Sequence, residues 1–223
     1  ALVLGASGRF GRNMADALTR HGWTVRRFDR ATDKLPKAAI GAELIVNAWN
    51  PPYSRWQAEV PGLTRQVIAA AKASGAAVLI PGNMYVFGEA LTIGTAPETP
   101  HLATNELGQV RRTMEAAYRD AGVKTIILRA GDYIDTEASG NWFDMIIAAK
   151  IAKGRFTYPG PLDRVRAWAY LPDLAEAGAQ VLAAAVSKDQ ADKIFRPAQK
   201  MARKSPRLIK AGIKIPAHKI EHD

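Results

Sequence analysis

Three glycines at three-residue intervals follow a short apolar run at the start of the chain, and this feature most constrains the fold. The run is Ala1–Leu4, and Gly5, Gly8 and Gly11 come directly after it. The run predicts a buried strand, and the helical spacing of the next apolar residues predicts a helix that ends at Gly22. Glycines let an anion approach the backbone N–H groups at the start of such a helix. The chain therefore opens with a predicted strand, a phosphate-binding turn and a helix.

Strands and helices continue to alternate over the first 130 residues. Further strands are predicted over residues 23–28, 44–48, 76–80 and 123–128, with helices over 55–74 and 105–121 and a loop over 88–104. Pro61 and Gly62 predict a break or kink inside the helix over 55–74. Parallel strands need crossover connections, which helices supply. The pattern predicts an α/β fold, a Rossmann-type doubly wound parallel sheet with helices on both faces.

The alternation of strands and helices stops after residue 130, where a small C-terminal substrate lobe is expected. Helices are predicted over 142–153 and 173–187, separated by the turn-rich residues 154–161. We therefore expect a dinucleotide-binding domain over 1–187, with lobe segments from about 131 to 171. Residues 188–223 form a basic C-terminal segment with 10 Lys and Arg against 4 Asp and Glu, and no firm structure is predicted for them. A solvated terminus is favoured over nucleic-acid binding, because no aromatic interleaving accompanies the charge.

Later segments carry a family resemblance. They are Pro81–Gly88 (PGNMYVFG), Pro97–Pro100 (PETP), Leu128–Asp132 (LRAGD) and Trp168–Ala175 (WAYLPDLA). With the G-x-x-G-x-x-G turn, they resemble the short-chain dehydrogenase/reductase superfamily, in particular its extended and atypical, epimerase/dehydratase-like branch, over about residues 1–185. In that resemblance Asp173 is a helix N-cap rather than a catalyst.

The predicted cofactor is a nicotinamide dinucleotide. The glycine turn is expected to bind its pyrophosphate, and the resemblance places the end of the third strand beside its adenosine. An acidic residue such as Asp29 at the end of the second strand favours NAD, whereas a basic residue such as Arg30 offsets the 2′-phosphate of NADP. Arg9 and Arg12 add positive charge, so NADP(H) is slightly favoured. The predicted cofactor residues are Gly5, Ser7, Gly8, Arg9, Phe10, Gly11, Asp29, Arg30, Ala48, Trp49 and Asn50.

The usual catalytic pair of the family is missing. Relatives that reduce or oxidise a carbonyl carry Tyr-x-x-x-Lys on a helix, and this chain has Leu107 and Arg111 at those positions. Leucine cannot transfer a proton, and arginine can hold a ribose or phosphate but cannot act as a base. Asn83 stands where the family has serine. Tyr85 is our first candidate proton donor, Tyr133 or Asp132 is the second, and a substrate that needs no protein acid is the third alternative. Tyr85, Asn83 and Arg111 are the predicted catalytic residues.

The sequence therefore predicts an NAD(P)-dependent oxidoreductase or epimerase/dehydratase-like protein that acts on a small carbonyl or sugar-type substrate. The alternative is a non-catalytic NAD(P)-binding sensor or regulatory module, favoured by Leu107. The proline-stiffened loop Asn50–Trp56 is expected at the pocket or on the surface, and the apolar residues 142–147 in the core or in a homodimer. Three arginines of the lobe are expected either to bind anionic groups or to be exposed to solvent. They are Arg155, Arg164 and Arg166.

Composition limits the remaining readings. The chain has 223 residues, 48% of them hydrophobic and none of them Cys, which excludes disorder, disulfides and thiolate metal sites. His218 and His222 lack a third ligand, so no metal site is predicted. No apolar run is long enough for a membrane span, and no secretory signal is visible, so we expect a cytoplasmic protein. The chain starts with Ala1 rather than Met, and we expect a residue or two upstream.

Overall fold

The computed structural model describes residues 1–90, 95–160 and 166–186. The chain divides into two units, Ala1–Ala177 and Gly178–Asp223. The described part of the second unit is the remainder of one helix, and the predicted basic segment over 188–223 lies outside the described residues. The domain boundaries drawn from the sequence therefore stay a prediction.

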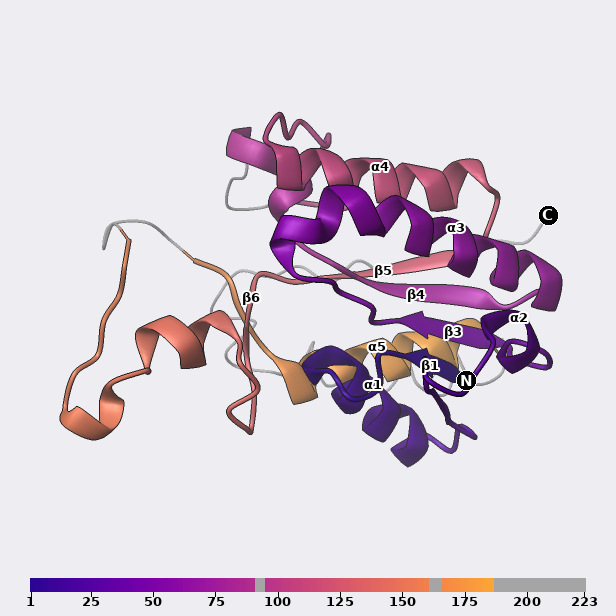
Figure 1. Ribbon diagram of the computed structural model, residues 1–223, viewed down its shortest axis with the longest axis horizontal. Helices are drawn as coiled ribbons and strands as arrows, with labels where there is room; N and C mark the ends of the chain where they lie inside the picture. The colour runs from indigo at the N-terminus through magenta and orange to yellow at the C-terminus, as the bar shows by residue number, and fades with distance from the viewer. Residues whose placement is uncertain (91–94, 161–165, 187–223) are drawn as a thin grey trace, which may run out of the picture. The chain divides into compact units, whose positions relative to one another are not determined.

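The first unit is built on a sheet of five parallel strands in the order β2-β1-β3-β4-β5 (Figure 1). The strands are β1 (Leu2–Leu4), β2 (Arg26–Phe28), β3 (Leu44–Asn47), β4 (Ala77–Gly82) and β5 (Thr125–Arg129). Side chains of the central strands are almost wholly buried, as expected for a parallel sheet covered on both faces. This confirms the predicted doubly wound α/β fold.

Helices cover both faces of the sheet. Helix α1 lies on one face, and α3 and α4 lie side by side on the other (Figure 1). The helices are α1 (Arg9–Arg20), α2 (Leu35–Ala38), α3 (Trp56–Ser74), α4 (Glu106–Asp120) and α5 (Leu171–Val186). The short turn η1 spans Tyr53–Arg55, and η2 (Tyr85–Ala90) consists of two short turns with a kink at Gly88. Leu2, Ile45, Val67 and Tyr118 belong to the buried cluster between the sheet and the α3–α4 layer.

The strand order reverses direction between β1 and β3. The chain runs outward from β1 to β2, then returns to the other side of β1 to continue as β3, β4 and β5. In open α/β sheets, ligands bind at such a switch point, outside the carboxyl ends of the strands. The glycine turn follows β1 and Ala48–Asn50 follows β3, so both segments meet at this edge.

Two predicted strand boundaries were wrong for identifiable reasons. The second strand begins at Arg26 rather than Trp23, because its only partner, β1, starts at Leu2 and pairs Leu2 with Arg26. The fourth strand does not end before Pro81 but runs through Gly82. Pairing with β3 stops at Leu79, so the missing N–H of Pro81 breaks no ladder bond there. A Cβ on Gly82 would lie 2.6 Å from the side chain of Ile127, which explains glycine at that point.

The helix over 55–74 was expected to break or kink at Pro61 and Gly62; it does not break, because α3 runs from Trp56 to Ser74 with Pro61 inside it. Pro61 lies in the second turn, so it removes one backbone bond near the end of the helix rather than in its middle. Asn105 caps the next helix, α4, and its side chain accepts the N–H of Gly108 at 2.8 Å.

The lobe segments contain a two-stranded parallel sheet that the sequence did not predict. It pairs β6 (Asp132–Ile134) with β7 (Trp168–Tyr170), and short strands of three residues carry no recognisable alternation. The predicted helix over 142–153 is instead two separate turns, η3 (Phe143–Ile147) and η4 (Ile151–Lys153). Lys150, with φ −120°, leaves helical geometry between them. Helix α5 starts at Leu171, so Asp173 lies in its first turn and is not its N-cap.

Candidate functional site

The glycine turn is held in a conformation that leaves the start of α1 open. Gly5 has φ +71°, and a Cβ there would lie 2.9 Å from the carbonyl oxygen of Ala48. A Cβ on Gly11 would lie 2.2 Å from the carbonyl oxygen of Gly5, so this glycine lets the helix pack on the turn. Gly8 is the N-cap and makes no side-chain cap, and the first turn of α1 has no acidic residue. Its free N–H groups and positive end suit an anion.

A cavity of about 650 Å³, which we call the glycine-turn cavity, opens between β1, β2 and β3. It is lined by Gly5, Ala6, Ser7, Gly8, Arg27, Phe28, Asp29, Arg30, Ala48, Trp49 and Asn50. Eight of the predicted cofactor residues are among them. The structure thus brings together residues from three strand ends, at the edge where the fold places a ligand.

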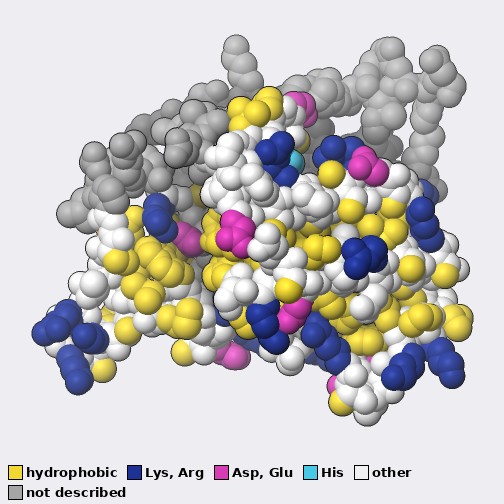
Figure 2. Space-filling view, turned by 45° about the horizontal axis from the view of Figure 1, so that its top comes forward, with side chains coloured by type: hydrophobic (Ala, Val, Ile, Leu, Met, Phe, Trp, Pro, Cys, Tyr) yellow, Lys and Arg dark blue, Asp and Glu magenta, His cyan; other side chains and the backbone are white. Residues whose placement is uncertain are grey.

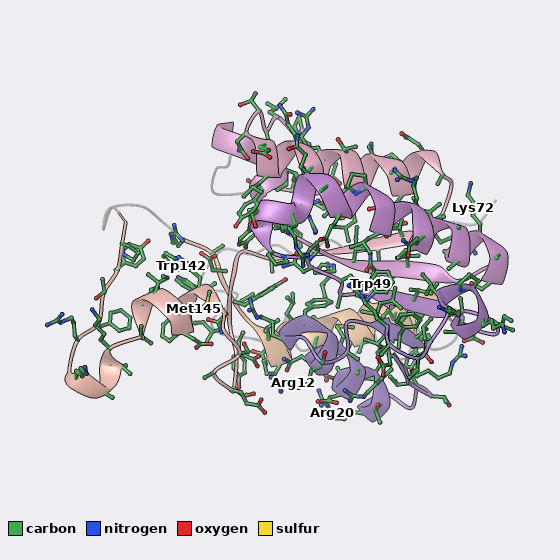
Figure 3. All side chains as sticks on the ribbon, in the orientation of Figure 1. Arg12, Arg20, Trp49, Lys72, Trp142 and Met145 are labelled. Carbon is green, nitrogen blue, oxygen red and sulfur yellow. The ribbon has the colours of Figure 1, made fainter. Side chains whose placement is uncertain are left out.

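Trp49 forms one wall of the glycine-turn cavity (Figure 3). Its indole packs edge-on against Phe28, with ring centroids 5.6 Å apart, and the guanidinium of Arg30 lies over it at 4.3 Å. Its backbone N–H donates to Oδ1 of Asn47 at 3.3 Å. This arrangement presents a flat aromatic face on which a purine can stack.

The charged residues predicted to select the cofactor do not all lie at the same cavity. Asp29 and Arg30 both line the glycine-turn cavity, and Oδ1 of Asp29 accepts the N–H of Ala31 at 2.9 Å. Arg9 instead donates to the carbonyl of Gly140 at 2.7 Å. Arg12 pairs with Asp135 at 3.0 Å. Of the three predicted arginines, only Arg30 therefore lines this cavity.

A second cavity of about 510 Å³, the central cavity, continues from the first. The two share Gly8, Ala48, Trp49 and Asn50. The central cavity brings together Arg9 and Phe10 with all three predicted catalytic residues, Asn83, Tyr85 and Arg111. The other predicted residue, Gly11, lines neither cavity because it packs on Gly5.

Arg111 is the most unusual side chain in the central cavity. It is only 6% exposed, and its Nη2 donates to the carbonyl oxygen of Pro81. Its guanidinium lies 5.4 Å from the ring of Trp56, and its Nε has no hydrogen-bond partner among the described residues. Burial lowers the pKa of Arg111, although arginine keeps its proton at neutral pH. A buried donor left unpaired is costly, so this atom points to a ligand.

Tyr85 lines the central cavity. Its hydroxyl lies 3.4 Å from that of Tyr53. Burial raises the pKa of Tyr85, and the hydrogen bond and charge of Tyr53 raise it further. Tyr85 is therefore a neutral phenol at physiological pH and suits the donation of a proton rather than its removal.

Asn83 and Leu107 occupy the other family positions. Asn83 lines the central cavity, and its Oδ1 accepts the N–H of Tyr85 at 3.1 Å. That contact leaves the amide nitrogen of Asn83 as a donor for a substrate oxygen. Leu107 lines neither cavity and packs against the buried core.

Several residues that line the central cavity were named from the sequence only as alternatives or in other roles. Tyr133 and Asp132, the alternative proton donors, do line the cavity, and burial raises the pKa of Tyr133 to about 12. Arg166 pairs with Asp132 at 2.8 Å and lies 4.5 Å from the ring of Trp142. Trp142, which projects from the lobe (Figure 3), had been expected in the core or a dimer. No local motif marks it, because the contact depends on how the lobe folds back.

The remaining surface adds little to this site. A hollow of about 410 Å³ on α4 is lined by His101, Arg112 and Arg119 and contains none of the predicted residues. Across the described ranges, no three His, Asp or Glu side chains gather as metal ligands. None of the helices described is long and apolar enough to cross a membrane.

No protein-family model matches the chain, and no curated protein matches it in sequence. Solved structures do match it. UDP-glucuronic acid 4-epimerase from Bacillus cereus in complex with NAD gives a TM-score of 0.68 at 14% identity, over 81% of this chain and 72% of that one. The NAD-dependent NDP-hexosamine 5,6-dehydratase TunA of tunicamycin biosynthesis gives 0.63 at 15% identity, over 81% and 71%.

A third similar structure is dTDP-4-dehydrorhamnose reductase from Bacillus anthracis in complex with NADP, with a TM-score of 0.61 at 17% identity, over 80% of this chain and 69% of that one. These three structures are a dehydratase named as NAD-dependent, a reductase in complex with NADP and an epimerase in complex with NAD. The chain shares their fold, which confirms the expected Rossmann-type α/β fold.

Proposed function

We propose that this protein is an NAD(P)-dependent oxidoreductase or epimerase/dehydratase-type enzyme that acts on a small carbonyl or sugar-type substrate without the Tyr-x-x-x-Lys pair. One observation carries the proposal. The cavity beside the glycine turn continues into a second cavity that holds a buried, unpaired Arg111 Nε and a neutral phenol. Such a site can bind an extended dinucleotide and then a substrate beside its far end.

The residues present fit a nicotinamide dinucleotide. The open start of α1 and the absence of a side chain at Gly8 suit the pyrophosphate. The face of Trp49 suits the adenine, and Arg111 suits a hydroxyl or phosphate oxygen at the nicotinamide half. When bound, the nicotinamide supplies or accepts a hydride.

The chain's own residues handle the substrate oxygen. The amide nitrogen of Asn83 donates a hydrogen bond that polarises a carbonyl, as the serine of relatives does. The hydroxyl of Tyr85 donates the proton that this oxygen takes up on reduction. The site as a whole favours reduction, because a tyrosine with a raised pKa is a poor base.

The decisive experiment identifies any dinucleotide that co-purifies and then follows its redox state against a panel of carbonyl compounds. We expect reduced dinucleotide to be consumed, and Tyr85→Phe to lower kcat about 100-fold. Turnover that is intact in Tyr85→Phe would remove tyrosine from its assigned role. Failure to bind either NADH or NADPH would refute the function itself.

We further propose that NADP(H) is the preferred cofactor, on the position of Arg30 at the glycine-turn cavity. Arg30→Ala should weaken NADPH binding about tenfold and leave NADH binding nearly unchanged, because only the former has a 2′-phosphate. Arg26→Ala is the matched control, since Arg26 donates to the carbonyl of Ile40 and lines neither cavity. Titration of each variant with both nucleotides measures the effect, and tighter binding of NADH by the native protein contradicts the preference.

A non-catalytic sensor is the second candidate, and the core position of Leu107 favours it. It predicts dinucleotide binding with no turnover of any carbonyl compound. Nucleic-acid binding has no support on the face that Figure 2 shows, where Lys and Arg are scattered among other side chains rather than gathered in one stripe.

A further inference from the structure

Two phenols meet at the wall of the central cavity. The hydroxyl oxygens of Tyr53 and Tyr85 lie 3.4 Å apart, and either hydroxyl can donate. Both rings pack against Trp56, with centroid distances of 4.9 Å for Tyr53 and 6.3 Å for Tyr85. Trp56 is buried and donates its indole N–H to the carbonyl of Pro51 at 2.9 Å. The pair therefore rests on a fixed aromatic support.

The loop that carries Tyr53 is stiff. Pro51 and Pro52 restrict the backbone directly before it, and the single turn η1 begins at Tyr53 itself. Backbone restraint and ring packing thus hold the Tyr53 hydroxyl near Tyr85 without relying on their hydrogen bond. The hydroxyl oxygens therefore stay close enough to form a shorter hydrogen bond, through which a proton can pass, after a small movement of either ring.

The two phenols differ in their access to water. Tyr53 is 57% exposed and Tyr85 is 38% exposed, and both line the central cavity. If Tyr85 gives its proton to a substrate, it must regain one before the next turnover. Arg111 cannot supply that proton, because guanidinium does not release it near neutral pH. Tyr53 is the more exposed of the two phenols, its hydroxyl lies 3.4 Å from that of Tyr85, and it carries an exchangeable proton.

We propose that Tyr53 is a relay residue that passes protons from solvent to Tyr85. The inference rests on the proposed carbonyl reduction. The carbonyl carbon receives the hydride that a reduced nicotinamide supplies, and the C=O π electrons move to oxygen. The Tyr85 O–H bond breaks and its proton bonds to that oxygen, giving the alcohol. The Tyr53 proton then moves to the Tyr85 oxygen, and water reprotonates Tyr53.

Kinetics of hydroxyl-deletion variants test the relay. Tyr53→Phe keeps the ring on Trp56 and removes only the hydroxyl, so kcat should fall about tenfold while KM and dinucleotide affinity stay unchanged. The double variant with Tyr85→Phe should be no slower than Tyr85→Phe alone, because both hydroxyls act in one chain. Tyr170→Phe is the matched control, since Tyr170 is an exposed residue of β7 that lines neither cavity. Native kcat in Tyr53→Phe, or losses that multiply, would overturn the relay.

A second measurement needs neither cofactor nor turnover. Isotope-labelled tyrosine is followed by NMR against pH, and the Tyr85 signal is assigned from its loss in Tyr85→Phe. We expect the pKa of Tyr85 to move down in Tyr53→Phe, because Tyr53 raises it in the native protein. An unchanged titration means that the phenols do not interact and overturns the relay. Absence of dinucleotide binding refutes the proposed function, whereas coupled titration with native turnover in Tyr53→Phe refutes the relay alone.

Discussion

At the scale of single residues, Gly8 and Gly11 differ in what a side chain would meet. A Cβ on Gly11 would lie 2.2 Å from the backbone of Gly5, whereas a Cβ on Gly8 meets only the Gly5 oxygen at 3.3 Å. Gly11→Ala should therefore cost about 1–3 kcal/mol of unfolding free energy. Gly8→Ala should leave stability nearly unchanged but weaken dinucleotide binding at least about tenfold, because its methyl group stands where the pyrophosphate approaches.

Thermal unfolding and NADPH titration of both variants measure this difference. Equal losses of stability would show that Gly8 is as structural as Gly11. Unchanged NADPH binding in a stable Gly8→Ala protein would show that no phosphate lies against the turn.

The sequence predicted this turn because glycine marks positions where the backbone takes a positive φ or approaches another backbone closely, as at Gly5 and Gly11. It could not predict the partners of Arg9 and Arg12, whose charges were assigned to the cofactor. Arg9 donates to Gly140 and Arg12 pairs with Asp135, residues more than 120 positions away. Long flexible side chains reach whichever acceptor the fold brings near, and sequence spacing does not reveal it.

At the scale of elements, α1 is joined to the segment that follows β6. Arg12 and Asn13 both donate to Asp135, whose side chain has no exposed surface. Burial by itself raises the pKa of Asp135, but hydrogen bonds from Asn13, Ser139 and the Thr136 backbone, with the charge of Arg12, outweigh it and lower the pKa below its ordinary 3.8. The carboxylate thus stabilises the fold above that pH and loses its contribution as the pH falls through the lowered value.

We expect Asp135→Asn to be less stable than the native protein at neutral pH, and the difference to shrink below about pH 4. Denaturant unfolding of both proteins across this range measures the effect. Asp16→Asn is the control, because the ion pair of Asp16 with Arg27 is exposed and contributes little. A stability gap that does not depend on pH would mean that Asp135 acts through packing rather than through its charge.

Elements were predictable where one face of a helix or a whole strand is buried, as in α1 and β3. They were not predictable where the strands are short and pair residues that lie far apart in the sequence. The strands β6 and β7 have three residues each, too few to show an alternation of apolar and polar residues. They form because the chain between them brings residues 168–170 back beside residues 132–134. Likewise, Tyr53 and Tyr85 come from different loops, and only the sheet edge brings them together.

At the scale of the whole molecule, the described residues that line the two cavities all lie before residue 168. A chain ending after Val186 keeps all of α5 and removes a segment rich in Lys and Arg. Its NADPH affinity should be unchanged near physiological salt, where charges beyond about 8 Å are screened. At low salt its association with the anionic dinucleotide should slow, because long-range attraction is lost. Stopped-flow binding at two salt concentrations measures both, and a loss of affinity at both would assign residues 187–223 a part in the site.

The guanidinium of Arg30 lies over the indole of Trp49, so the fluorescence of this tryptophan can report on what occupies the cavity. A purine that settled on the face of the indole that Arg30 covers would displace the guanidinium at 4.3 Å, a contact worth about 0.5–1 kcal/mol. In the proposed function, nucleotide entry on that face is an exchange of one planar group for another. The same exchange alters the surroundings of a fluorescent ring, so the emission of Trp49 should register occupancy before any chemistry takes place.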